Sequence, residues 1–165
     1  MKLKRLFKHL WTFRYHLHAA FPSSALAEIE AKITESETQH AGEIRFAVET
    51  SLDGSALLRD QTPRERAVEV FSNLRVWDTE ENCGLLIYVL LADRAVEIVA
   101  DRGIHAKVGE QEWNRICQDM QSEYSRENYQ AGLLLGIEQM TLHLKTHFPV
   151  QMNDRDELPN QPVQL

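Results

Sequence analysis

The feature that most constrains the fold is a pair of short apolar runs joined by a charged turn. The first run, residues 85–91, is apolar at every position and is bounded by Gly84 and Asp93. A run of this length is too short to cross a membrane, so it predicts a strand that is buried on both faces of a sheet. The second run, residues 95–100, follows at once and predicts an antiparallel hairpin.

The residues before the hairpin predict a second strand and a crossover helix. Residues 43–50 alternate between polar and apolar side chains, as a strand with one solvated or functional face does. The tetrapeptide Thr62-Pro63-Arg64-Glu65 has the pattern of a capping box with proline at the first helical position. A strand–helix–strand crossover normally makes its two strands parallel, so we expect the first strand to lie parallel to residues 85–91.

Apolar residues at helical spacing predict three more helices around this unit. One begins after Pro22-Ser23-Ser24 and ends near Gly42, and the other two cover residues 113–124 and 129–144. Together these elements predict an α/β fold, namely a three-layer α/β/α sandwich with a small mixed sheet. The sheet is parallel at the crossover and antiparallel at the hairpin.

Length and charge limit the class of protein. A chain of 165 residues with 43% apolar and 26% charged residues fits a single soluble globular domain. The net charge of −7 disfavours nucleic-acid binding, and no apolar stretch is long enough for a transmembrane span. Without a clear signal peptide, the sequence predicts a cytoplasmic protein. We expect three parts: a basic amphipathic segment at 1–21, an α/β domain at 22–149 and a polar, disordered tail at 150–165.

The N-terminal segment, residues 1–21, carries basic side chains and no acidic one. Its apolar residues recur at spacings near three and four, which predicts one apolar stripe on a basic helix. Such a stripe can pack on its own domain or on a protein partner. The alternative is that the stripe lies on an anionic membrane surface with Trp11 at the headgroups, which would make the protein membrane-peripheral.

Acidic side chains occur at both ends of the predicted hairpin. Asp93 and Arg94 form the turn, at the carboxyl end of a parallel strand, where ligands of open α/β sheets bind. Asp78 and Asp101 fall at the opposite end, about 20–25 Å away, and Glu43 begins its own strand there. Carboxylates are ligands that calcium and magnesium prefer, although a solvated turn and an acidic surface loop would look the same in sequence. The sequence leaves open which end carries a site.

The motifs of this region resemble those of the TPM domain family, which includes thylakoid-lumen proteins linked to photosystem repair and many bacterial proteins. The resemblance spans roughly residues 25–148 and depends on residues 82–89, 93–98 and 101–104, with Gly42-Glu43-Ile44-Arg45 upstream and Trp113 downstream. It implies the same fold, a bound divalent cation (calcium or magnesium) near the strand ends and, in some members, acid phosphatase activity. By match to the family, it assigns the metal to Asp78, Asp93, Asp101 and Glu43, and an anion contact to Arg94.

The chain also departs from the family pattern. Cys83 stands where many members have a second asparagine, and the signal peptide and C-terminal membrane helix of many members are not recognisable. Our leading hypothesis is a TPM-like domain that binds a divalent cation, with metal-assisted phosphomonoester hydrolysis as its reaction if it is catalytic. The alternative is a non-catalytic interaction module that docks on a membrane or a partner protein through residues 1–21.

Overall fold

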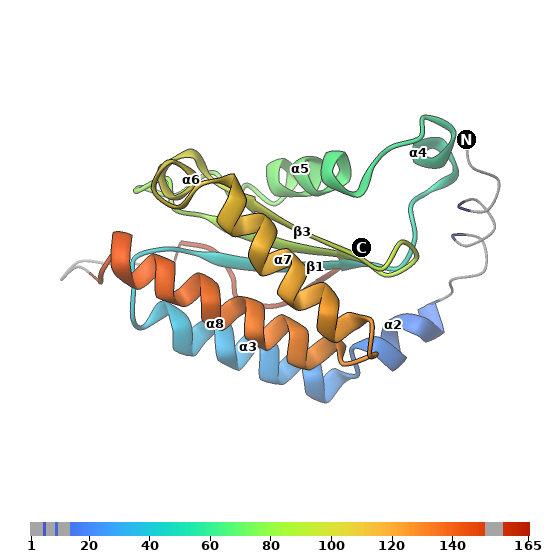
Figure 1. The fold of residues 1–165 in the computed structure, drawn as a ribbon, viewed down its shortest axis with the longest axis horizontal. Coiled ribbons are helices and arrows are strands. Elements are labelled where there is room, and N and C mark those ends of the chain that lie inside the picture. The colour runs from blue at the N-terminus through green and yellow to red at the C-terminus, as the bar shows by residue number, and fades with distance from the viewer. Residues whose placement is uncertain (1–4, 6–8, 10–13, 151–156) are drawn as a thin grey trace.

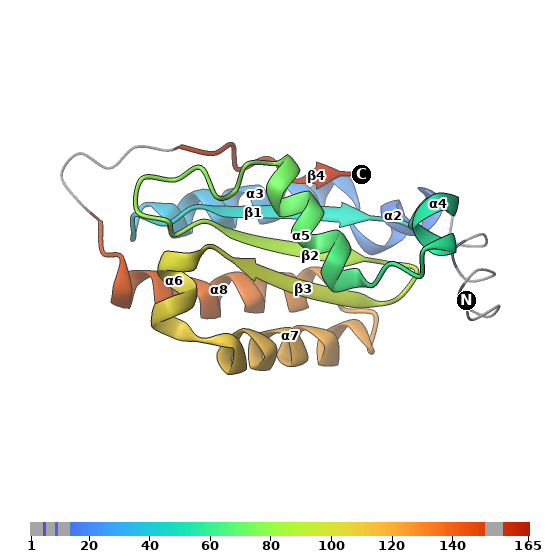
Figure 2. The ribbon, with the colours of Figure 1, turned by 90° about the horizontal axis from the view of Figure 1, so that it is seen from above.

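The computed structural model describes Arg5, His9, residues 14–150 and residues 157–165. A four-stranded mixed sheet in the order β3-β2-β1-β4 forms the middle layer, and helices cover both of its faces (Figures 1 and 2). The predicted three-layer α/β/α sandwich is thereby confirmed. The strands are β1 (Ile44–Glu49), β2 (Leu85–Leu90), β3 (Ala95–Ala100) and β4 (Val163–Gln164).

The predicted hairpin and crossover form the centre of the sheet. β1 and β2 are parallel, in register from Ile44 opposite Leu85 to Glu49 opposite Leu90. β2 and β3 form the antiparallel hairpin, so β2 lies between two partners. All six residues of β2 are buried, which its unbroken apolar sequence predicts for a central strand.

Successive side chains of β1 and β2 point to opposite faces and fill two apolar clusters. On one face, Ile44, Phe46 and Val48 pack with α3 (Ser23–Glu37), α7 (Glu110–Tyr124) and α8 (Tyr129–His147). On the other face, Ala47, Leu86 and Tyr88 pack with α5 (Pro63–Asn73), which Figure 1 shows on the opposite side of the sheet from α3 and α8. The remaining helices are short: α2 (Arg14–Ala20), α4 (Gly54–Leu58) and α6 (Arg102–Val108).

The capping box predicted at the start of α5 is present. The amide of Glu65 donates to Thr62 Oγ1 at 3.2 Å, and the Glu65 carboxylate accepts from the amide of Thr62 at 2.8 Å. Proline at the first helical position adds a fixed φ to this start. The cap therefore fixes the chain at the entrance of α5, which lies beside the site described below.

Described residues of both terminal segments pack against the domain. Leu17 and Phe21, from the N-terminal segment, are buried in the cluster on the α3 side. In the described part of the tail, residues 157–165, Leu158 is buried and Val163–Gln164 pair with β1. No helix in the described ranges is long and apolar enough to span a membrane.

Candidate functional site

Asp93 lies in the turn between β2 and β3, as predicted. The parallel pairing of β1 with β2 continues past the ends of the strands. The amide of Leu91 donates to the carbonyl of Glu49 at 3.0 Å, and the amide of Ala92 donates to the carbonyl of Thr50 at 3.0 Å. The amide of Arg94 then donates to the carbonyl of Leu91 at 3.0 Å and closes the turn. Asp93 is thus placed at the carboxyl end of the parallel strands, where open α/β sheets bind ligands.

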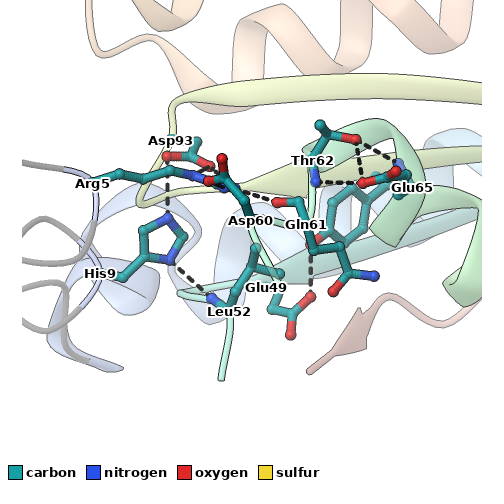
Figure 3. Close-up of polar contacts among 10 residues, drawn as sticks. Arg5, His9, Glu49, Leu52, Asp60, Gln61, Thr62, Glu65 and Asp93 are labelled. Carbon is teal, nitrogen blue, oxygen red and sulfur yellow. Dashed lines mark hydrogen bonds and ion pairs between the residues drawn. The ribbon is translucent and has the colours of Figure 1, made fainter. Parts of the chain in front are cut away.

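The guanidinium of Arg5 occupies this end of the sheet (Figure 3). Its Nε and Nη2 donate to Asp93 Oδ2 at 3.0 and 2.8 Å, and Nη2 also donates to the backbone carbonyl of Gln61 at 2.7 Å. Asp60 Oδ1 lies 3.6 Å from Nη1. We call Asp60 Oδ1, the Gln61 carbonyl oxygen and Asp93 Oδ2 the oxygen cage. Two of these oxygens come from the adjacent residues Asp60 and Gln61 and the third from the hairpin turn, and all three contact the guanidinium of Arg5.

His9 holds the other oxygen of Asp93. Its Nε2 lies 3.1 Å from Asp93 Oδ1, and its Nδ1 accepts from the amide of Leu52 at 3.0 Å (Figure 3). Because Nδ1 is an acceptor, the neutral ring carries its proton on Nε2 and donates to Asp93. Through these two contacts the buried side chain of His9 joins the turn of the hairpin to the loop that follows β1.

The connection between α4 and α5 sets the position of Asp60 and Gln61. The amide of Gln61 donates to the carbonyl of Ala56 at 3.0 Å, and Asp60 takes a left-handed conformation with φ of 54°. The next residue, Thr62, caps α5. The Gln61 carbonyl is therefore fixed between two helix ends, whereas the exposed side chain of Asp60 has more freedom to move.

Asp93 is ionised in this setting. Burial of its carboxyl group favours the neutral form, but the hydrogen bonds from Arg5 and His9 and the nearby positive charge outweigh burial and lower the pKa of Asp93 below its ordinary value. A carboxylate that accepts from a guanidinium in this way makes one of the stronger kinds of hydrogen bond in proteins. Asp93 therefore carries a full negative charge at neutral pH.

The other predicted metal residues lie at the opposite end of the sheet. Asp101 caps α6 by accepting from the amide of Arg102 at 2.7 Å, and its Oδ2 is buried without a hydrogen-bond partner in the described part of the chain. Glu43 is buried and accepts from the amides of Glu157 and Leu158 at 3.0 and 3.3 Å. Asp78 is exposed. The four predicted carboxylates are thus divided between two ends of the sheet.

Metal ligation by side chains alone has limited support. Among the residues that the structure describes, no three or more His, Cys, Asp or Glu side chains are grouped so that they could hold a metal ion. The oxygen cage differs from such a group, because one of its three oxygens is the backbone carbonyl of Gln61. Of the predicted ligands, only Asp93 contributes to it.

Arg94, the predicted anion contact, is exposed beside the oxygen cage. It lies on the wall of a cavity of about 360 Å³, together with His16 and Tyr129. The lining of this cavity also includes Leu91 and Ala92, which precede Asp93 in the hairpin. A group bound in the cavity would therefore be near the turn that holds Asp93.

A second charged cluster, on the face of the sheet that α5 covers, is fully occupied by the chain's own donors. Glu49 accepts from Tyr88 Oη at 2.6 Å and from Arg66 Nε and Nη2 at 2.9 and 3.1 Å. Burial and the neighbouring carboxylate raise the pKa of Tyr88 far above its ordinary value. Because both oxygens of Glu49 already accept hydrogen bonds, we interpret this cluster as part of the packing between β1, β2 and α5.

Sequence reasoning identified Asp93 but not the groups that surround it. Arg5 is 88 residues away from Asp93 in the chain, and its contribution to an N-terminal basic stripe was the only sign of a function. Asp60 and Gln61 belong to a polar loop with no motif. A basic residue in a segment without acids does predict an acidic contact, but nothing in the sequence specifies which acid.

Comparison with known proteins gives the same family as the sequence motifs. The family model described as the TPM domain matches residues 17–142. The NMR structure of the BA42 protein from the psychrophilic bacterium Bizionia argentinensis is 29% identical, with a TM-score of 0.76 over 88% of this chain and 95% of that chain. The N-terminal domain of a protein from P. gingivalis, at 20% identity and a TM-score of 0.64 over 81% and 84% of the two chains, shares the fold. No curated protein matches the chain.

Proposed function

We propose that this chain, which belongs to the TPM domain family, is a binding domain that takes a divalent cation in the oxygen cage around Asp93. One observation carries the proposal. The cage already holds a cationic group, the Arg5 guanidinium, between a carboxylate oxygen of Asp93, the Gln61 carbonyl and the carboxylate of Asp60. The same oxygens would hold a metal ion once Arg5 leaves.

The oxygens of the cage are the kind that calcium takes in proteins. Carboxylate and backbone carbonyl oxygens both ligate Ca²⁺, whose coordination geometry is flexible, whereas Mg²⁺ demands a near-ideal octahedron. Asp93 can offer Oδ2, the oxygen that Arg5 releases, Asp60 can approach because it is exposed, and water can complete the shell. A doubly charged ion also gains more from two carboxylates than a singly charged guanidinium does. We therefore expect calcium to bind better than magnesium.

Arg5 acts in this proposal as an internal competitor. The guanidinium and the ion use the same oxygens, so the cage is open only in the fraction of molecules in which Arg5 has left. The apparent affinity for the ion is then reduced by that fraction. Removal of Arg5 should make the ion bind more tightly, provided that Asp93 keeps its place in the turn.

Replacement of Arg5 by methionine is expected to lower the dissociation constant for calcium roughly tenfold. If Arg5 occupies the oxygen cage in about nine-tenths of the molecules, the apparent affinity for the ion is reduced by that factor in the wild type. Isothermal titration calorimetry of the full chain with CaCl₂ measures the change. Arg115→Met is the matched control: Arg115 is an exposed arginine of α7 that pairs with Glu112 and Asp119, so its loss changes the net charge equally without touching the cage. Equal calcium affinities of the two variants would contradict the proposal.

Two further functions remain predictions. Metal-assisted phosphatase activity, which the family resemblance implied, would require an anion contact beside the ion. Arg94, which follows Asp93 in the chain and lines a cavity, would be that contact. Docking on a membrane or a partner protein would use the apolar stripe of residues 1–21, most of which lie outside the described residues. The p-nitrophenyl phosphate assay tests the first function, and liposome sedimentation tests the second.

A further inference from the structure

The described end of the tail, residues 157–165, follows the outer edge of β1 as an extended peptide (Figure 2). Val163 and Gln164 form β4, parallel to β1 and opposite Ala47 and Val48. The amide of Leu165 donates to the carbonyl of Val48 at 3.0 Å. The edge of the sheet therefore receives a strand through backbone groups, which is the contact that many peptide-binding domains make with a partner.

Two buried groups hold the other end of this segment. Leu158 is only 9% exposed and lies in the apolar cluster on the α5 side of the sheet. The carboxylate of Glu43, itself 4% exposed, accepts from the two successive amides of Glu157 and Leu158. The first group selects an apolar side chain, and the second binds backbone amides of any sequence.

The tail lies beyond the residues that the family model matches, which end at residue 142. Every residue of β1 is buried, so removal of the tail would leave open the unpaired backbone groups along the outer edge of a buried strand. The Glu43 carboxylate would also lose two donors from a buried position. The edge is thus shaped to be covered by an extended segment.

We infer that the outer edge of β1 is a peptide-binding groove that the chain fills with its own tail. The partner that fits it is an extended protein segment with a leucine and, five residues later, a valine, as in Leu158 and Val163. The amide preceding the leucine and the leucine amide bind Glu43, and the valine pairs with Ala47. A partner segment must compete with a tail whose effective concentration is on the order of millimolar, so it binds when the tail is released.

The test uses a fluorescent peptide with the sequence of residues 157–165 and the full chain with Leu158→Ser, which weakens the tail. We expect saturable binding to this variant, with amide NMR shifts at Ala47 and Val48, and at least tenfold weaker binding to the wild type. A peptide in which serine replaces the leucine is the matched control and should bind at least tenfold more weakly to the variant.

A second variant keeps the test decisive if Leu158→Ser disturbs the fold. Leu165→Pro removes the amide that donates to Val48 and leaves both apolar clusters intact. It should bind the peptide more tightly than the wild type does. The inference is overturned if a folded variant with a weakened tail binds the peptide no better than the wild type, or if it binds the serine peptide equally well.

Discussion

Replacement of Gly84 by alanine is expected to lower the free energy of unfolding by about 3–5 kcal/mol, since overpacking that displaces the backbone lies at the upper end of mutational effects. Gly84 immediately precedes β2 inside the motif that identifies the family. A Cβ atom there would lie 1.9 Å from the carbonyl oxygen of Val76 and 3.0 Å from its carbonyl carbon. Val76 is fully buried, so this carbonyl can move only with the surrounding chain.

Gly54→Ala is the matched control for this prediction. Gly54 is the first residue of α4, and a Cβ atom added to it would meet nothing within 4 Å. Its φ is not in the left-handed region, so alanine should stabilise the protein by about 0.5 kcal/mol through the lower entropy of the unfolded chain. Urea denaturation of both variants measures the difference. A loss of stability below 1 kcal/mol in Gly84→Ala would show that the Val76 loop moves aside easily.

The stability of the protein should fall steeply between pH 7 and pH 4 because of His40. Burial lowers the pKa of His40 from 6.5 to about 4 in the folded state. The unfolded chain therefore takes up a proton at a higher pH than the folded protein does, and stability is lost as the pH falls through 6.5. The loss is complete below the folded pKa and amounts to about 3 kcal/mol, of which about 2 kcal/mol has been lost at pH 5.

Burial is what disfavours the charged form of His40, and the hydrogen bonds around the ring fit its neutral form. The amide of Gly42 donates to its Nδ1 at 3.2 Å, so the proton of the neutral ring is on Nε2, which donates to Ser36 Oγ at 2.7 Å. The Ser36 hydroxyl lies 2.6 Å from Thr141 Oγ1, which donates to the carbonyl of Ile137 at 2.7 Å. This buried chain has every donor matched to an acceptor only while Nδ1 is free of a proton.

Urea denaturation at pH 7.5 and pH 5, applied to the wild type and to His40→Gln, tests the prediction. The loss of stability between the two pH values should be about 2 kcal/mol smaller in the variant, because glutamine does not titrate. His147→Gln, at an exposed position at the end of α8, is the control for the exchange of histidine for glutamine itself. The same pH dependence in His40→Gln and the wild type would mean that other groups cause the acid destabilisation.

The sheet could be predicted because its determinants are local. The unbroken apolar run of β2 and the capping box of α5 each depend on neighbouring residues, and each appears in the structure as expected. β1 also forms where its alternation predicts a strand, but the expected solvated face is wrong, because helices cover both faces of the sheet and all six residues of β1 are buried. β4 could not be predicted in this way. Only Leu158 and Val163 are apolar anchors in a polar stretch with prolines, and their binding surface is formed by residues more than a hundred positions earlier.

The candidate site was predictable only in part, for the same reason. The position of Asp93 follows from strand direction, which the sequence indicates. Its contacts with Arg5 and His9 join residues that are 88 and 84 positions apart in the chain, and the spacing of residues in the sequence does not predict such contacts. The role of Asp101 as a helix cap could have been inferred, because an aspartate directly before a helix is a common N-cap.

The proposed exchange between Arg5 and a calcium ion is tested most directly by an NMR titration of the full chain with CaCl₂, repeated for Asp93→Asn and Asp101→Asn. We predict saturable amide shifts at Asp60, Gln61 and Asp93, accompanied by a shift of the Arg5 Nε–H signal as the guanidinium leaves Asp93. Asp93→Asn should abolish these shifts, and Asp101→Asn should preserve them. Shifts confined to the surroundings of Asp101 and lost in Asp101→Asn, or no saturable shift at all, would contradict a calcium site in the oxygen cage.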